Sequence, residues 1–95
     1  PTITSAPATV NYGVTFPVST PNAAQITDAR WIRLGAVTHA FDVGGIATTL
    51  TFTRTATGVD ITPPATPNIA PPGYYMVFIL NRNGVPSAGK VVKVQ

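Results

Sequence analysis

Short runs in which apolar residues alternate with polar ones recur along the whole chain, as in β-strands that bury one face. These candidate strands lie around Ile3 and at Val14–Val18, Ala29–Leu34, Thr49–Thr53, Val59–Ile61, Tyr74–Leu80 and Lys90–Val94. Tyr74–Leu80 differs from the others because it is apolar at every position, which predicts a central strand buried on both faces. About seven short strands in a chain of this length predict an immunoglobulin-like two-sheet β-sandwich.

Proline and glycine separate these candidate strands and exclude a long helix, since the chain contains ten Pro and eight Gly. The sequence Asn81-Arg82-Asn83-Gly84 predicts a turn between the last two strands. Pro63–Pro72 contains five prolines and is expected to be an extended crossover. Thr20-Pro21 favours one helical turn through Gln25.

The sequence Pro72-Gly73-Tyr74-Tyr75 resembles a tyrosine corner, in which a Tyr hydroxyl bonds to the backbone a few residues upstream and fixes a crossover between sheets. The pattern does not decide between Tyr74 and Tyr75. For both residues it favours a structural role over a functional one.

Length and composition indicate one ordered domain that spans residues 1–95. The chain is 44% hydrophobic and only 9% charged, which is too apolar for intrinsic disorder. Its longest apolar run, Tyr74–Leu80, is far shorter than the roughly 20 residues of a membrane-spanning helix. The formal net charge of +3 comes from Lys and Arg residues that form no run, so we expect neither a nucleic-acid partner nor a membrane span. The absence of Cys excludes disulfides and thiolate metal ligands.

Few residues could carry chemistry. The three carboxylates, Asp28, Asp42 and Asp60, are far apart in the sequence, and no Ser lies in a Gly-x-Ser-x-Gly motif. His39 is the only His in the chain and the one candidate for metal binding or acid–base catalysis. A single imidazole does not make a metal site, so the remaining ligands would come from a second domain or a second chain. The alternative is a His that only forms hydrogen bonds within its own loop.

Two separated motifs carry a resemblance to a known family. Trp31–His39 contains Arg-x-Gly-x-x-Thr-His, from Arg33 to His39, and resembles a segment of the C-terminal domain of galactose oxidase and glyoxal oxidase. Pro71–Asn81, followed by Gly84–Ser87, is similar to the closing hairpin of the same domain. The family usually has Gln-Arg six and seven residues beyond the His and a Leu four residues later. This chain keeps the Leu, as Leu50, but has Gly45 and Ile46 in place of the Gln-Arg pair.

The resemblance implies an early-set immunoglobulin-like domain, the C-terminal part of a secreted copper-radical oxidase that oxidises alcohols, sugars or aldehydes and produces hydrogen peroxide. In that family a loop of this domain enters a kelch-type β-propeller, and its His is a copper ligand. The corresponding residue here is His39. The other ligands, two Tyr and a His, belong to the propeller, so the resemblance implies that the isolated chain is inactive and binds copper weakly at best.

Two further functions remain open from the sequence. One is a non-enzymatic carbohydrate-binding or adhesive module, in which aromatic rings would stack on sugars. The candidate aromatic residues are Tyr12, Trp31, Tyr74 and Tyr75. The other is a structural subunit that assembles through exposed strand edges. The connection between the strands predicted at Ala29–Leu34 and Thr49–Thr53 is too long for a tight hairpin, and it contains the turn residues Asp42, Gly44 and Gly45. We therefore expect Val37–Gly45 to be exposed, with the His39 imidazole at least partly accessible.

Overall fold

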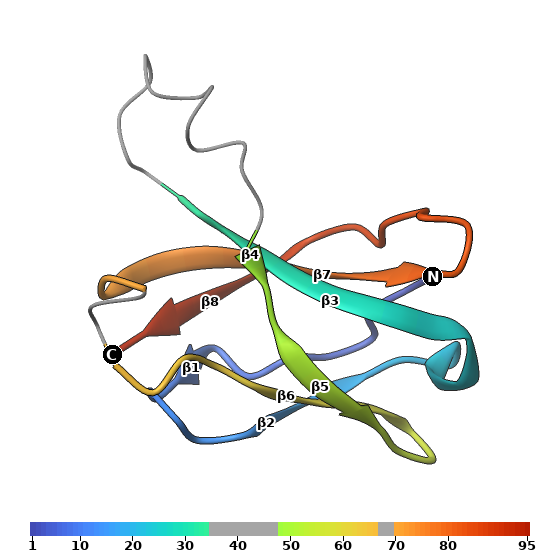
Figure 1. The fold of residues 1–95 in the computed structure, drawn as a ribbon, viewed down its shortest axis with the longest axis horizontal. Helices are drawn as coiled ribbons and strands as arrows, with labels where there is room; N and C mark the ends of the chain where they lie inside the picture. Colours follow the sequence, from blue (N-terminus) through green and yellow to red (C-terminus); the bar gives the residue numbers. More distant parts are fainter. Residues whose placement is uncertain (35–47, 67–69) are drawn as a thin grey trace.

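Two stacked β-sheets make up the protein (Figure 1), in a computed structural model that describes residues 1–34, 48–66 and 70–95. The larger sheet contains, in spatial order, β1 (Thr9–Val10), β8 (Lys90–Val94), β7 (Gly73–Asn81), β3 (Ile26–Arg33) and β4 (Thr48–Thr49). The smaller sheet contains β2 (Phe16–Ser19), β6 (Gly58–Thr62) and β5 (Thr51–Arg54). The prediction of an all-β, two-sheet, immunoglobulin-like sandwich is confirmed.

Inward-facing side chains of both sheets form a single core among the described residues. The largest fully buried side chains are Trp31, Ile26, Ile61, Ile79, Val18, Val59, Val77, Val92 and Val94. They come from β2, β3, β6, β7 and β8, mostly at alternating positions, because successive side chains of a strand point to opposite faces. Ile26 departs from the alternation of β3 because the register shifts between Ile26 and Asp28. Since this core needs no residue from outside the chain, we expect the isolated domain to fold.

The predicted strand Thr49–Thr53 divides between the two sheets. β4 pairs with β3, whereas β5 pairs with β6. Leu50, between them, is buried, and its N–H donates to the carbonyl of Ala29 over 2.8 Å. The Arg54 Nε donates to the carbonyl of Ile26 over 2.7 Å. The chain thus closes one side of the sandwich as it passes from one sheet to the other. With β1, which the sequence pattern did not predict, and without the strand expected around Ile3, the described residues form eight strands.

The edges of the sheets are short. β1 and β4, at the edges of the larger sheet, have two residues each. β2 is an edge of the smaller sheet and contains Pro17, which has no N–H to donate. Short edge strands and an edge proline are features that limit pairing between sheets of different molecules, so they disfavour assembly through β1, β4 and β2. β5 (Thr51–Arg54), the other edge of the smaller sheet, has neither feature.

The prediction for Tyr74–Leu80 is right about its neighbours and wrong about its burial. β7 lies between β3 and β8, as expected of a central strand. However, its residues alternate, with Tyr75, Val77 and Ile79 buried while Tyr74 is 55% exposed. The reason is that the smaller sheet covers only the inner face of the larger one. The outer face of β7 has no sheet packed against it among the described residues.

The turns and crossovers between the strands lie where glycine, asparagine and proline predicted them. Gly84 adopts a positive φ of 75°, and its N–H donates to the carbonyl of Asn81 over 2.9 Å, which confirms the turn after β7. The crossover predicted for Pro63–Pro72 joins β6 in one sheet to β7 in the other. The one predicted helical turn is a 3-10 turn, η1 (Ala23–Gln25). The strand expected around Ile3 is instead an isolated bridge between Ser5 and Ser19, and Ile3 is buried.

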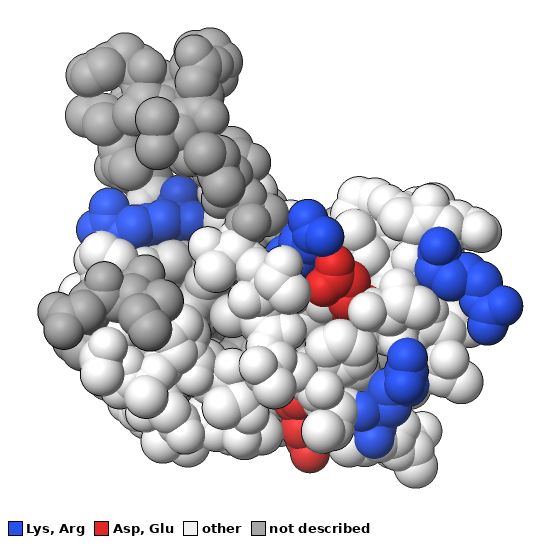
Figure 2. All heavy atoms as spheres, viewed as in Figure 1, with Lys and Arg blue, Asp and Glu red and all other residues white. Residues whose placement is uncertain are grey.

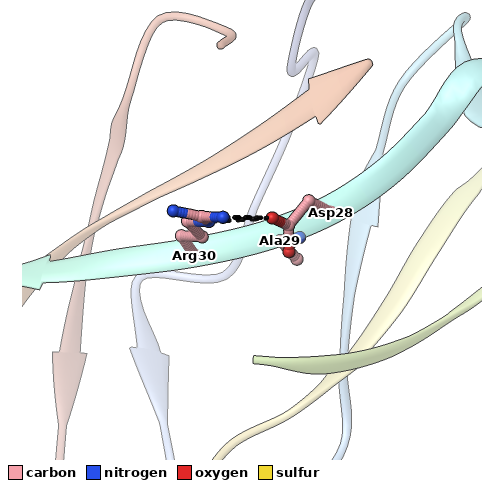
Figure 3. Close-up of polar contacts among 3 residues, drawn as sticks. All are labelled: Asp28, Ala29 and Arg30. Atoms are coloured by element: carbon pink, nitrogen blue, oxygen red, sulfur yellow. Dashed lines mark hydrogen bonds and ion pairs between the residues drawn. The ribbon is translucent and has the colours of Figure 1, made fainter. Parts of the chain in front are cut away.

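Charged side chains are dispersed. On the face shown in Figure 2, Lys and Arg are scattered and do not form one basic patch. Arg30 Nη2 lies 2.7 Å from Asp28 Oδ2 on β3 (Figure 3), and Arg30 Nε donates to the same oxygen over 2.8 Å. In the described part of the chain, no helix has the length and apolarity to cross a membrane.

Candidate functional site

The segment with His39 is the leading candidate from the sequence, and Val37–Gly45 lies outside the described residues. Its attachment points are described. β3 ends at Arg33, β4 begins at Thr48, and Trp31 pairs with Thr48. Two neighbouring antiparallel strands therefore hold the two ends of this segment at the same end of the larger sheet. The accessibility of the His39 imidazole stays a prediction.

Three side chains at this end of the sandwich bind three successive carbonyls of the crossover before β7. The Tyr12 hydroxyl donates to the carbonyl of Ala70 over 2.6 Å, and the Tyr75 hydroxyl donates to that of Pro71 over 2.6 Å. The Arg33 Nη2 donates to the carbonyl of Pro72 over 3.3 Å. Because Arg33 is the last residue of β3, the same contacts fix the crossover and the point where the segment with His39 begins.

Tyr75 is the tyrosine corner, which decides between the two candidates. Its ring is buried against Trp31, with the ring centroids 4.4 Å apart and the planes tilted by 32°. Burial raises the pKa of the Tyr75 hydroxyl above its ordinary value, although the nearby Arg33 guanidinium acts in the opposite direction. A tyrosine hydroxyl is protonated at neutral pH even at its ordinary pKa, as its donation to Pro71 requires, and burial only extends that range to higher pH.

We expect Tyr75→Phe to lower the free energy of unfolding by about 1 kcal/mol, because it removes one hydrogen bond and leaves the Pro71 carbonyl without this donor. Chemical denaturation of the isolated chain measures this loss. Tyr74→Phe is the matched control, since Tyr74 is exposed and its replacement should leave stability unchanged. Equal effects of the two substitutions would contradict the assignment.

The described residues form no metal site. Within residues 1–34, 48–66 and 70–95, no three His, Cys, Asp or Glu side chains lie close enough together to hold a metal ion. Asp28 is paired with Arg30 on the larger sheet, whereas Asp60 lies on β6 of the smaller sheet. The metal-ligand role expected of His39 stays a prediction, because this residue lies outside the described ranges.

The aromatic residues proposed for sugar stacking are mostly unavailable. Trp31 and Tyr75 are buried, and the half-buried Tyr12 directs its hydroxyl to a backbone carbonyl. Tyr74 alone among the four is exposed. A depression of about 350 Å³ at the opposite end of the sandwich is lined by Gln25, Asn81, Arg82 and Asn83. The Asn81 side-chain oxygen there accepts the N–H groups of Asn83 and Val85, so it stabilises the turn.

Sequence analysis missed the roles of Arg33 and Tyr12. Arg33 was visible only as the first residue of the Arg-x-Gly-x-x-Thr-His motif, which does not indicate a bond to Pro72. Tyr12 and Ala70 are separated by 58 positions, and no local pattern predicts a contact across such a distance. A Tyr flanked by Asn11 and Gly13 gives no signal of this role beyond its residue type.

Comparison with known proteins places the chain in a family. Residues 1–94 match the family model described as "Galactose oxidase-like, Early set domain". A galactose oxidase from Gibberella zeae is 33% identical over 86 residues, which are 90% of this chain and 12% of that protein. The aldehyde oxidase GLOX from Vitis pseudoreticulata is 32% identical over 103 aligned positions, covering 99% of this chain and 20% of that protein.

Solved structures agree with this match. A copper-bound fungal alcohol oxidase of the AA5 family superposes with a TM-score of 0.79 at 27% identity, over 98% of this chain and 20% of that one. The Bacteroides ovatus protein SGBP-B, solved with a mixed-linkage heptasaccharide, has a TM-score of 0.63 at 19% identity over 100% of this chain and 22% of that one, a likeness of fold alone. The chain spans between about one eighth and one fifth of the length of the curated relatives it matches. Since the family model covers residues 1–94, the chain belongs to the galactose oxidase-like early set domain family.

Proposed function

We propose that this chain is the C-terminal accessory domain of a secreted copper-radical oxidase and that its His39 is one of the copper ligands. The remaining ligands belong to a kelch-type β-propeller of the same parent protein. When copper is bound, that centre supplies the oxidation of an alcohol, sugar or aldehyde and the reduction of oxygen to hydrogen peroxide. The role of this chain is to hold one imidazole in place.

The observation that carries the proposal is the way both ends of the segment around His39 are anchored. The β3 end is held by the Arg33 bond to Pro72, and the backbone N–H of Leu34 donates to the carbonyl of Tyr74 over 2.8 Å. The β4 end is paired with β3 and is followed by the buried Leu50. A segment attached to neighbouring strands of a rigid sandwich can present a metal ligand at a defined position.

Arg33 and Tyr75 are positioning residues in this scheme, since both act on the crossover that adjoins the β3 end. The neutral Tyr75 hydroxyl donates to the carbonyl of Pro71, and the Arg33 guanidinium donates to the carbonyl of Pro72. An imidazole is a suitable ligand for Cu(II), and it binds the metal in its neutral form.

We expect the isolated chain to retain no stoichiometric copper after dialysis and to produce no hydrogen peroxide, because one imidazole cannot replace the several protein ligands of a tight copper site. The full-length parent protein should retain copper and produce peroxide from alcohols, sugars or aldehydes. Metal analysis and a peroxide assay on both proteins measure this difference. Stoichiometric copper in the isolated chain, or a copper-loaded parent that oxidises none of these substrates, would contradict the proposal.

A further inference from the structure

The turn after β7 contains Asn83-Gly84, the one Asn-Gly pair in the sequence. Both residues are exposed. The side-chain amide carbon of an Asn can be attacked by the backbone nitrogen of the next residue, which closes a succinimide ring. A side chain on that next residue hinders the attack, and glycine has none. The pair therefore places an unhindered nitrogen beside an amide carbon that is in contact with water.

Open space surrounds this pair. A β-carbon built on Gly84 would have no described atom within 4 Å. Asn83 also lines the depression of about 350 Å³ at this end of the sandwich, which gives water access to its amide. The described residues therefore leave room both for closure of the ring and for its hydrolysis.

The other described Asn residues lack this combination. Each precedes a residue with a side chain: Asn11, Asn22 and Asn81 are followed by Tyr12, Ala23 and Arg82. Two of them also have a side-chain oxygen held by the backbone. The Asn22 Oδ1 accepts the N–H of Thr2 over 3.0 Å, and the Asn81 Oδ1 accepts two N–H groups in the turn. Asn68 lies outside the described residues.

The turn itself restrains the reaction at Asn83. The Gly84 N–H, whose nitrogen has to attack, donates to the carbonyl of Asn81 over 2.9 Å. The Asn81 Oδ1 accepts the N–H of Asn83 over 2.9 Å and that of Val85 over 3.1 Å. Asn81 therefore holds the backbone on both sides of the Asn83–Gly84 peptide. Ring closure requires this turn to open, and local opening costs less free energy than unfolding of the whole domain.

We propose that Asn83 is a site of spontaneous deamidation whose rate is limited by the hydrogen bonds of Asn81. In the first step the Gly84 nitrogen loses its proton and bonds to the Asn83 Cγ, the Cγ–Nδ2 bond breaks, and ammonia leaves with that proton. One water molecule then hydrolyses the succinimide at either of its two carbonyls. The product is Asp or isoaspartate at position 83, so the whole reaction exchanges an amide and water for a carboxylic acid and ammonia.

The product changes the charge and the backbone of this turn. Its carboxylate lies in the depression that the Arg82 guanidinium also lines, and it lowers the formal net charge of the chain, which is +3 before the reaction, by one. Isoaspartate also adds a carbon to the backbone path, which disturbs the spacing of the two N–H groups that Asn81 binds. The site lies at the end of the sandwich opposite the attachment of the His39 segment, so this inference does not rest on the proposed function.

Incubation of the isolated chain in mildly alkaline buffer tests the proposal. Peptide mapping by mass spectrometry should show a mass increase of about 1 Da confined to the fragment with Asn83. Isoaspartyl methyltransferase should label the same fragment. Both signals should increase with time and with pH, because the attacking nitrogen has to lose its proton. The matched control is Asn83→Gln, which keeps an amide but forms the larger ring slowly and should show neither signal.

A synthetic peptide with the sequence of residues 79–87 provides the reference rate without the fold. The folded chain should convert at Asn83 more slowly than this peptide, and in denaturant at the same rate. An unmodified Asn83 in the folded chain after complete conversion of the peptide would overturn the proposal. Conversion of Asn11 or Asn22 as fast as that of Asn83 would also overturn it.

Asn81→Ala tests the restraint. We expect conversion at Asn83 to be several-fold faster in this variant, because it removes the acceptor of the Asn83 and Val85 N–H groups. Asn22→Ala removes another side-chain acceptor of a backbone N–H, outside the turn, and should leave the rate at Asn83 unchanged. Circular dichroism checks that both variants fold. Equal rates in a folded Asn81→Ala chain and in the unaltered chain would contradict the role of Asn81, as would equal rates of the unaltered chain with and without denaturant.

Discussion

Replacing His39 by Ala in the full-length parent protein is expected to abolish stoichiometric copper binding and peroxide production. In the proposed function the imidazole is the ligand that this domain supplies, and alanine has no donor atom to replace it. Loss of an outer-shell partner of a metal ligand costs about 10–100-fold in affinity or activity, so loss of the ligand should cost at least about 100-fold. Metal analysis after dialysis and a peroxide assay measure the two effects.

The fold of the sandwich should not change in this variant, because residues of both sheets that the structure describes already form one continuous core. Thermal unfolding of the isolated chain with and without His39→Ala checks this point. Thr53→Ala is a suitable control in the parent, since Thr53 is exposed on the outer face of the smaller sheet. A His39→Ala parent with normal copper content and normal peroxide production would disprove the assignment of His39 as a ligand.

Trp31→Ala should destabilise the isolated chain by about 3–5 kcal/mol, the range measured for large aromatic side chains removed from a core. Trp31 is 1% exposed and lies against the Tyr75 ring. Because small domains are stable by only about 5–15 kcal/mol, this substitution should remove much of the stability of the fold. Chemical denaturation followed by circular dichroism provides the measurement.

Tyr74→Ala is the control for Trp31→Ala in the isolated chain. It removes a ring of similar size on the same end of the larger sheet, but Tyr74 is 55% exposed, so its loss should stay within about 0.5 kcal/mol. A Trp31→Ala chain that loses no more than the Tyr74→Ala chain would show that the ring at position 31 does not hold the core together.

The interpretation of Trp31 also affects function. From the sequence, the Trp31 ring could either stack on a sugar or pack in the core. Its pairing with Thr48 and its contact with Tyr75 place it under the strand ends from which the His39 segment begins. The ring thus supports the attachment of that segment from inside the core.

Local sequence pattern determined much of this protein. Alternating residues marked β2 and β6, because burial of one face of a strand imposes a period of two, and short apolar segments marked β3 and β8. Turn chemistry marked the connection at Asn81–Gly84 and the proline-rich crossover, because glycine permits positive φ and proline cannot donate to a sheet. The sequence also excluded a cysteine ligand and left His39 as the one imidazole, since residue types are independent of the fold.

Tertiary structure alone decided the features that depend on which distant segments meet. Tyr74 and Tyr75 have nearly the same local sequence, and only the position of the smaller sheet makes one of them buried and the other exposed. Leu50 divides one predicted strand between two sheets, because its flanking residues find different partners. The apolar run of β7 indicated burial on both faces, yet among the described residues a second sheet covers only one of them. Whether a side chain is buried depends on which distant segments pack against it, and the local sequence pattern does not specify those segments.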